Sequence, residues 1–126
     1  MTNKNTSATR YFSDNHEKSI CKALGAKQTT NSGAGMFKKG DIVHEEADML
    51  IEAKCCMSPK NSVSIKKEWI EKNKSEGFAT RKYNSAVCIN FEPNGDNYYI
   101  VNEKLMKYLI DKLVEENSWN IFNFIL

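Results

Sequence analysis

The alternation of apolar and polar side chains between positions 47 and 57 is the clearest structural signal in the chain. The odd positions, from Ala47 to Met57, are all apolar, whereas the even positions 48, 52 and 54 are charged. A period of two residues is typical of a β-strand with one face in the core. The sequence therefore predicts a strand with Glu52 and Lys54 side by side on the opposite, exposed face.

A shorter strand over 41–44 is predicted to form a hairpin with this segment. The residues at 45 and 46 lack the positive-φ types that a two-residue hairpin prefers, which favours a four-residue turn over His44 to Ala47. With any loop of even length, Asp41 pairs opposite Leu50 and shares the face of the charged pair. A loop of odd length would place Asp41 on the other face.

The remaining pattern predicts three helices and three further strands. Helical periodicity begins at Asp14, so residues 1–8 are interpreted as a mobile tail and 9–126 as one folded domain. The other expected elements are a strand at 26–30, a helix from a Ser64 cap to about Glu76 with Gly77 as its stop, a hairpin of 85–91 and 96–101 around Asn94-Gly95, and a last helix capped by Asn102. This order predicts an α/β domain, with α+β as the alternative, in which helices flank a mixed central sheet of four or five strands.

Composition narrows the class of protein. The chain has 126 residues, of which 40% are hydrophobic and 27% charged, which excludes a multidomain enzyme and a fully disordered chain. No apolar run approaches the roughly 20 residues of a membrane span, so we expect a soluble cytoplasmic protein, cellular or encoded by a phage in its bacterial host. The four cysteines form no C-x-x-C pair and are interpreted as buried free thiols in a reducing compartment. His16 and His44 are interpreted as surface or core residues rather than metal ligands.

Charge is distributed unevenly along the chain. Residues 1–82 carry 15 basic and 10 acidic side chains, and residues 83–126 carry 3 and 6. A basic front part is compatible with a phosphate-rich partner such as DNA, although solvated lysine-rich faces are also common. The small-residue loop over 29–40 can let a phosphate approach closely or can serve as a plain connection. Candidate DNA contacts are Arg10, Lys18, Ser32, Gly33, Lys38, Lys39, Lys60, Lys66 and Lys67.

Asp41, Glu52 and Lys54 together would bring two carboxylates and an ammonium to one sheet face. Carboxylate oxygens are hard ligands that suit Mg²⁺ or Mn²⁺. A nearby ammonium can polarise a metal-bound water or neutralise charge on a phosphate. These are the groups that phosphodiester hydrolysis requires. The alternative is a solvated ion pair, because a Glu-x-Lys triplet is frequent by chance.

The order of these motifs resembles the PD-(D/E)XK nuclease superfamily, and more narrowly the archaeal-type Holliday junction resolvases, including those carried by phages. The resemblance extends from about residue 14 to residue 113. It departs from the family at Gly40, where proline is usual, at Lys18, where arginine is common, and at Glu68-Trp69, where glutamine is frequent. The corresponding motifs are Glu17, Ser32-Gly33, Gly40-Asp41, Glu52-Ala53-Lys54 and Lys66-Lys67-Glu68-Trp69.

The resemblance implies a restriction-endonuclease-like domain that resolves branched DNA with Mg²⁺, for which Mn²⁺ can substitute. Asp41 and Glu52 would bind the metal with the backbone carbonyl of Ala53, and Lys54 would position or activate the attacking water. The resemblance also places Glu17 at the metal site, although a helix cap with Asp14 is an alternative role for Glu17. Ser32 would contact DNA phosphate or support the site.

Paired nicks in a four-way junction suit a homodimer. Its candidate interface is the apolar tail Trp119–Leu126 with one face of the last helix, although the tail could instead cover its own core. Two other functions remain open: a restriction-like or repair endonuclease with another DNA target, and a DNA-binding module without catalysis.

Overall fold

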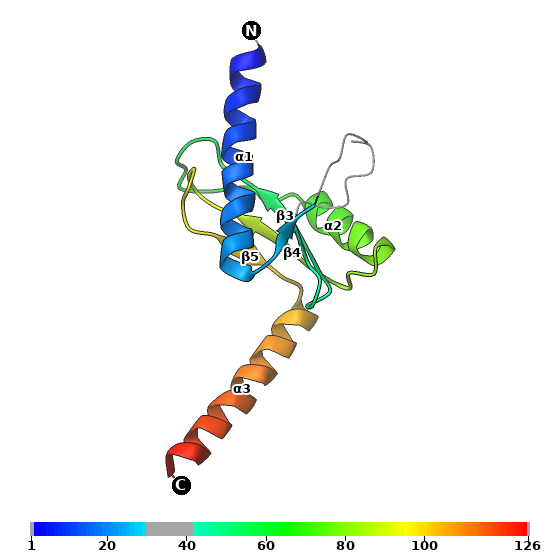
Figure 1. Cartoon of the computed structure of the whole chain (residues 1–126), viewed down its shortest axis with the longest axis vertical. Helices are drawn as coiled ribbons and strands as arrows, with labels where there is room; N and C mark the ends of the chain where they lie inside the picture. Colours follow the sequence, from blue (N-terminus) through cyan, green and yellow to red (C-terminus); the bar gives the residue numbers. More distant parts are fainter. Residues whose placement is uncertain (1, 30–41, 126) are drawn as a thin grey trace.

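The computed structural model describes residues 2–29 and 42–125, with side chains described over 8–29 and 42–120. The predictions for Ser32, Gly33, Lys38, Lys39 and Asp41 lie outside the described residues. Along the chain the elements are α1 (Thr2–Leu24), β1 (Lys27–Gln28), β2 (Ile42–His44), β3 (Met49–Lys54), α2 (Lys67–Ala79), β4 (Asn84–Ile89), β5 (Tyr98–Ile100) and α3 (Glu103–Ile125) (Figure 1).

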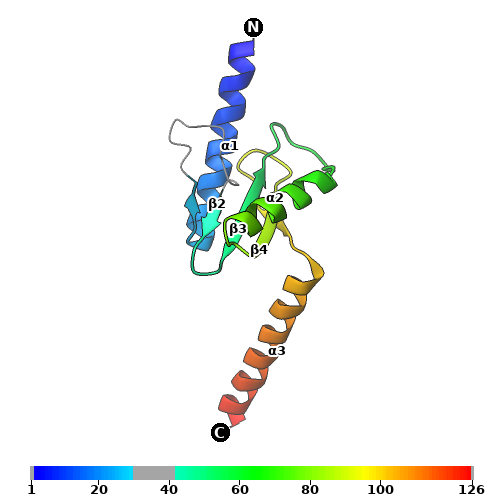
Figure 2. The same ribbon diagram turned by 90° about the vertical axis from the view of Figure 1, so that its right-hand side faces the viewer.

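The five strands form one mixed sheet in the order β1-β2-β3-β4-β5. The central pair, β3 and β4, is parallel, and α2 makes the crossover between them; the other pairs are antiparallel. Helices α1 and α2 lie on opposite faces of the sheet (Figures 1 and 2). The predicted α/β fold with a mixed sheet of four or five strands is therefore confirmed.

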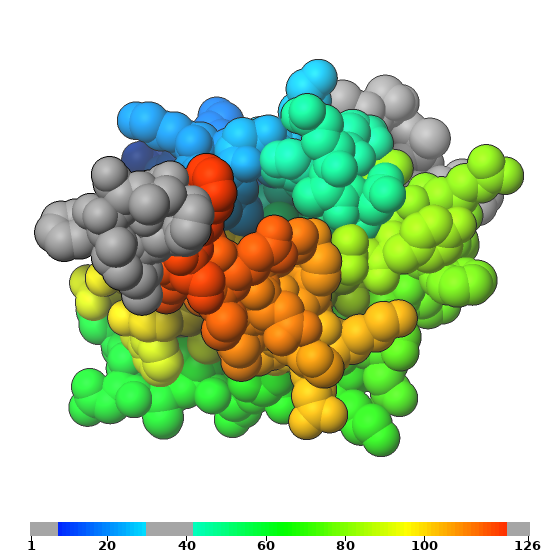
Figure 3. Space-filling model, turned by 90° about the horizontal axis from the view of Figure 1, so that it is seen from below, coloured from blue at the N-terminus to red at the C-terminus, as the bar shows by residue number. Residues whose placement is uncertain are grey.

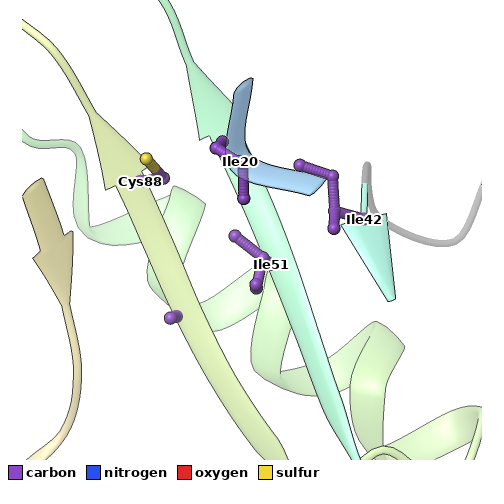
Figure 4. Packing of buried hydrophobic residues seen from close by; sticks show 5 residues of the cluster. Ile20, Ile42, Ile51 and Cys88 are labelled. Atoms are coloured by element: carbon purple, nitrogen blue, oxygen red, sulfur yellow. The ribbon is translucent and has the colours of Figure 1, made fainter. Parts of the chain in front are cut away.

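The core between α1 and the sheet is built around Ile20 (Figure 4). Ile20 packs against side chains from three neighbouring strands, namely Ile42, Ile51, Ala86 and Cys88. The pairing of Ile42 with Ile51, and of Ile51 with Ala86, puts these side chains in one row across the sheet. Burying one aliphatic side chain contributes about 1.5–3 kcal/mol, so this row stabilises the attachment of α1.

The opposite face of the sheet is held to α2 by a buried amide. The Asn73 side-chain nitrogen donates to the carbonyl of Leu50 at 3.0 Å and to the carbonyl of Ala86 at 3.1 Å. These two carbonyls belong to β3 and β4, so one side chain links the helix to both central strands. Leu50 itself is fully buried. The face of β3 that carries Leu50, Glu52 and Lys54 was predicted to be exposed. Instead, α2 covers this face along part of its length.

Both predicted ends of the α2 helix were wrong. Lys66, not Ser64, occupies the N-cap position, and no side chain caps this end. At the other end the helix continues past Gly77 to Ala79. A Cβ atom at Gly77 would lie 2.6 Å from the carbonyl oxygen of Lys82, so glycine is needed there for close packing rather than to end the helix.

The hairpin between β2 and β3 has the predicted four-residue turn, displaced by one residue to 45–48. Asp48 has a φ of 49° and donates its N–H to the carbonyl of Glu45. Leu50 pairs with Val43, so the predicted pairing of Leu50 with Asp41 was wrong by two residues. The loop has an even number of residues, so odd-numbered residues of β2 share a sheet face with even-numbered residues of β3, as predicted.

Helix α1 begins at Thr2 rather than at Asp14, so residues 2–8 are helical where a tail was expected. No glycine or proline interrupts residues 2–24, and this favours one continuous helix. Asp14 therefore lies inside the helix, and the N-terminal capping role proposed for Asp14 and Glu17 is excluded.

The hairpin of β4 and β5 closes at the pair Ile89 and Tyr98. Within its loop, Asn94 has a φ of 62° and the Gly95 N–H donates to Glu92, which confirms a turn at the predicted Asn-Gly site. The predicted cap of the last helix is also confirmed, because the Asn102 side-chain oxygen accepts the N–H of Leu105 at 2.8 Å. Beyond this cap, α3 runs away from the sheet (Figures 1 and 2).

Candidate active site

Glu52 and Lys54 lie together on the α2 side of β3. The neighbouring side chain of Ile51 packs toward α1, and the alternation of the strand turns Glu52 and Lys54 the other way. The Lys54 Nζ atom is 3.5 Å from the Glu52 Oε2 atom. The Glu52 side chain is only 17% exposed and that of Lys54 is 35% exposed. The sequence prediction that these two residues lie side by side is confirmed.

A hollow of about 300 Å³ opens beside this pair, between β3 and the first turns of α2. Glu68, Trp69 and Lys72 complete its lining. The Lys54 ammonium lies 4.9 Å from the centre of the Trp69 ring, a distance at which the ring face attracts a cation. The hollow therefore holds two carboxylates and two ammonium groups around one aromatic wall.

Glu17 lies on the helix that covers the other face of the sheet. Its carboxylate accepts a hydrogen bond of 3.2 Å from the Gln28 amide, which also donates to Asp14 at 3.1 Å. The hydrogen bond from Lys18, at 2.8 Å, together with the Gln28 amide, lowers the pKa of Asp14. The described contacts tie Glu17 to the edge strand β1, and α1 packs on the face away from Glu52 and Lys54.

The remaining predicted site residues fall into two groups. Ala53 lies between Glu52 and Lys54 in β3, and its side chain packs against the core on the α1 side. Asp41 and Ser32 are outside the described residues. Asp41 is nevertheless joined by one peptide bond to Ile42, and Ile42 pairs with Ile51, the residue before Glu52.

The described basic residues that are proposed to contact DNA lie on separate elements. Arg10 and Lys18 are carried by α1. Lys66 and Lys67 lie at the start of α2, adjacent in sequence to Glu68 and Trp69 of the hollow. Lys60 is exposed in the loop before α2, where its N–H donates to Phe91. Lys66 and Lys67 are thus the basic residues nearest in sequence to the hollow.

Within residues 2–29 and 42–125, no group of three or more His, Cys, Asp or Glu side chains could hold a metal ion. His16 is buried, and its Nε2 atom lies 3.0 Å from the Asn97 side-chain oxygen. His44 accepts the N–H of Ala47 with its Nδ1 atom. His16 is thus a core residue, and His44 supports the turn that follows β2. The four cysteines are free thiols, as predicted, but only Cys56 and Cys88 are buried, whereas Cys21 and Cys55 are half-buried.

Trp69 and Lys72 were not among the predicted site residues. For Trp69, the signal was present in the sequence as a helical spacing. Trp69, Asn73 and Gly77 recur every four residues and so lie on one face of α2. Asn73 and Gly77 are the buried residues of this helix. Asn73 and Gly77 at this spacing indicate the side of α2 that faces the sheet. Trp69 lies on the same side at the N-terminal end of the helix, where the hollow opens.

Comparison with known proteins adds no family to this description. No model of a known protein family, no curated protein and no solved structure matches the chain. Among the described helices, none has the length and apolar character that crossing a membrane requires.

Proposed function

We propose that this protein is a metal-dependent endodeoxyribonuclease that acts on branched DNA, as a homodimeric Holliday junction resolvase. The observation that carries the proposal is the joint placement of Glu52 and Lys54 in a hollow, on the strand next to the one that Asp41 precedes. A carboxylate and an ammonium that merely form a solvated pair would not need to lie between a sheet and a helix.

The register of β2 and β3 supports Asp41 as the second carboxylate. Ile42 pairs with Ile51 in an antiparallel ladder. Asp41 is the residue before Ile42 and Glu52 is the residue after Ile51, so an extension of the same antiparallel ladder by one pair would bring the two acidic residues opposite each other. Consecutive Cα atoms are 3.8 Å apart, which limits how far Asp41 can lie from this pair.

A divalent ion would be held by the carboxylates of Asp41 and Glu52 with the Ala53 carbonyl, a set of hard oxygen ligands that fits Mg²⁺ and Mn²⁺. When bound, it supplies Lewis acidity toward the phosphate oxygens and toward water. Lys54 faces the hollow and can stabilise the negative charge that grows on the phosphate during hydrolysis. Trp69 and Glu52 restrict the ammonium from two sides, and the apolar ring lowers the local access of water.

The DNA strand is proposed to approach over the start of α2, where Lys66 and Lys67 can contact phosphates. One chain presents one Glu52–Lys54 pair. Two symmetric nicks in a four-way junction therefore need two copies related by a two-fold axis.

The test is nicking of a synthetic four-way junction and of a linear duplex of the same sequence, with Mg²⁺ and with a chelator. We expect Mg²⁺-dependent nicking of the junction. The variants Asp41→Asn, Glu52→Gln and Lys54→Ala should each lower its rate by about 100-fold or more. Glu46→Gln is the matched control, because Glu46 is an exposed carboxylate in the turn between β2 and β3, and its rate should stay within about twofold.

Other outcomes would overturn the proposal in identifiable ways. Equal cleavage of linear duplex would indicate a restriction-like or repair endonuclease. Junction binding without metal-dependent cleavage would indicate a DNA-binding module without catalysis. Unchanged rates in the three site variants would remove the Glu52–Lys54 hollow as the active site.

A further inference from the structure

Helix α3 carries an apolar face that the described residues leave open. At helical spacing, five large side chains are between 43% and 60% exposed, namely Met106, Leu109, Ile110, Leu113 and Val114. Seen from below, α3 stands in front of the body that carries the sheet (Figure 3). Because an isolated helix is marginally stable in water, an apolar face of this kind is stabilised when another surface covers it.

The polar side of α3 is satisfied within the helix itself. Lys107 pairs with Asp111 at 3.0 Å, and Lys112 pairs with Glu115 at 3.6 Å. These ion pairs suit this side to water, although Tyr108 and Trp119 are also exposed on it, at 57% and 60%. The contrast with the apolar face indicates that α3 has one face for solvent and one for a partner.

A second open apolar surface lies at the base of α3. A groove of about 160 Å³ between α2 and the β4–β5 pair is lined by Ile70, Val87, Ile100 and Val101 and ends at Asn102. Ile70 is 37% exposed at its rim. Because Asn102 caps α3 beside the groove, the far turns of the helix point away from the groove of their own chain.

We propose that the apolar face of α3 docks on α3 of a second copy of this chain in the antiparallel sense. The C-terminal half of each helix then reaches the groove at the base of the partner's helix. Both surfaces exist in one chain, so a two-fold axis satisfies each of them twice, which is the requirement for an isologous interface. The interface deepens the homodimer of the proposed function, but it does not depend on the nuclease chemistry.

Charge favours the antiparallel sense over the parallel one. Residues 103–112 contain three lysines and two acidic residues, whereas residues 113–125 contain two glutamates and no basic residue. Antiparallel packing brings the basic half of one helix beside the acidic half of the other, and it also opposes the helix dipoles favourably. Lys74 lines the groove, and neither it nor Glu116 has an ion pair among the described residues.

The length of α3 is sufficient for a stable dimer. Its 23 residues span about 34 Å at 1.5 Å per residue. Specific interfaces bury at least about 1,200 Å² in total, and both the helix face and the groove at its base contribute to that area.

The test is sedimentation equilibrium of the full chain over a wide dilution series, without DNA and without metal. We expect a dimer, and we expect Leu109→Glu and Leu113→Glu each to raise its dissociation constant by about 100-fold or more. Tyr108→Glu is the matched control: Tyr108 is 57% exposed on the other side of the helix, and the change should have less than about a threefold effect. Circular dichroism and thermal melting check that each variant keeps the sheet and α1.

A charge exchange tests the antiparallel docking in the groove. Glu116→Lys should weaken the dimer, and adding Lys74→Glu should restore it. A monomeric wild type, a dimer that Leu109→Glu leaves intact, or an unrestored double variant would each overturn the proposal. A compact monomer in X-ray scattering would show that α3 folds back on its own chain. Because association is measured without substrate, its failure is distinct from a failure of nuclease activity.

Discussion

The Lys54 ammonium lies between the Trp69 ring, whose centre is 4.9 Å away, and the Glu52 carboxylate, whose Oε2 atom is 3.5 Å away. The three residues come from two elements, β3 and α2. Lys54 is therefore positioned from both the strand and the helix, and Trp69 links the geometry of the candidate site to the packing of α2.

Replacing Trp69 should affect the nuclease reaction more than DNA binding. A cation–π contact at a partly exposed site is worth about 0.5–2 kcal/mol, which corresponds to a loss of about 2-fold to 30-fold in rate when it stabilises Lys54 in the productive position. Trp69→Leu should lower the single-turnover nicking rate within this range, and Trp69→Phe should lower it less because a ring remains. Junction affinity should stay within about twofold, since Trp69 acts through Lys54.

The control for this series is Phe78→Leu. Phe78 is an exposed aromatic residue at the far end of α2, so its loss should leave the nicking rate unchanged. A Trp69→Leu variant as fast as the wild type would show that Lys54 needs no aromatic support.

Replacing Glu52 should weaken metal binding, whereas replacing Lys54 should strengthen it. Mg²⁺ that binds only the folded chain raises the free energy of unfolding, by about 2.7 kcal/mol at 100 times its dissociation constant. Glu52→Gln removes a ligand and should abolish most of the Mg²⁺-induced rise in Tm. Lys54→Met removes a competing cation 3.5 Å from that carboxylate and should increase the rise, although it stops nicking. Differential scanning calorimetry with and without Mg²⁺ measures the rise in Tm of both variants, and Glu46→Gln should behave as the wild type does. An increment that Glu52→Gln leaves unchanged would place the metal elsewhere.

Gly77→Ala should destabilise the fold even though alanine favours helices. The new Cβ would lie 2.6 Å from the Lys82 carbonyl oxygen and 3.7 Å from the Leu50 Cβ, and a backbone atom cannot move away as a flexible side chain can. Overpacking of this kind costs about 1–3 kcal/mol, which exceeds the gain of about 1 kcal/mol in helix propensity. Urea unfolding measures the difference. Ser75→Ala, at an exposed position of the same helix, should be neutral or slightly stabilising. A more stable Gly77→Ala variant would contradict the close packing of α2 on the sheet.

The strand at the centre of the sheet could be predicted because its signal is local. The alternation of apolar and polar residues showed which of its side chains share a face. The even loop length showed which residues of β2 share that face. The start of α2 could not be predicted from such signals. Ser64 has the composition of a cap, but the chain stays non-helical until Lys67. Gly77 suggested a stop, but its role depends on Lys82 and Leu50, which approach it only in the folded state.

The candidate site also combines a feature that local sequence signals predict with one that depends on the folded state. Glu52 and Lys54 are neighbours on one strand, so their proximity followed from the sequence. The contact of Lys54 with Trp69 depends on how α2 crosses the sheet, and no spacing along the chain encodes that crossing. Asp14 suggested a helix start because the residues before it lack apolar periodicity, yet α1 extends to Thr2 through a segment that contains no glycine or proline.

Buried Cys88 and its partly exposed cross-strand neighbour Tyr99 should make the protein sensitive to alkaline pH. These residues are paired across β4 and β5. Burial raises the pKa of the Cys88 thiol to about 11 from an ordinary 9.0, and burial is also the main cause of a raised pKa at Tyr99. The folded state thus holds these protons longer than the unfolded chain does. The resulting stabilisation is complete below about pH 9 and is lost as the pH rises toward 11. Urea unfolding between pH 8 and pH 11 should show a decline that Cys88→Ala makes shallower, whereas Tyr83→Phe, a change at an exposed tyrosine, should leave the slope unaltered. If Cys88→Ala kept the full alkaline decline, the titration responsible would lie at other groups.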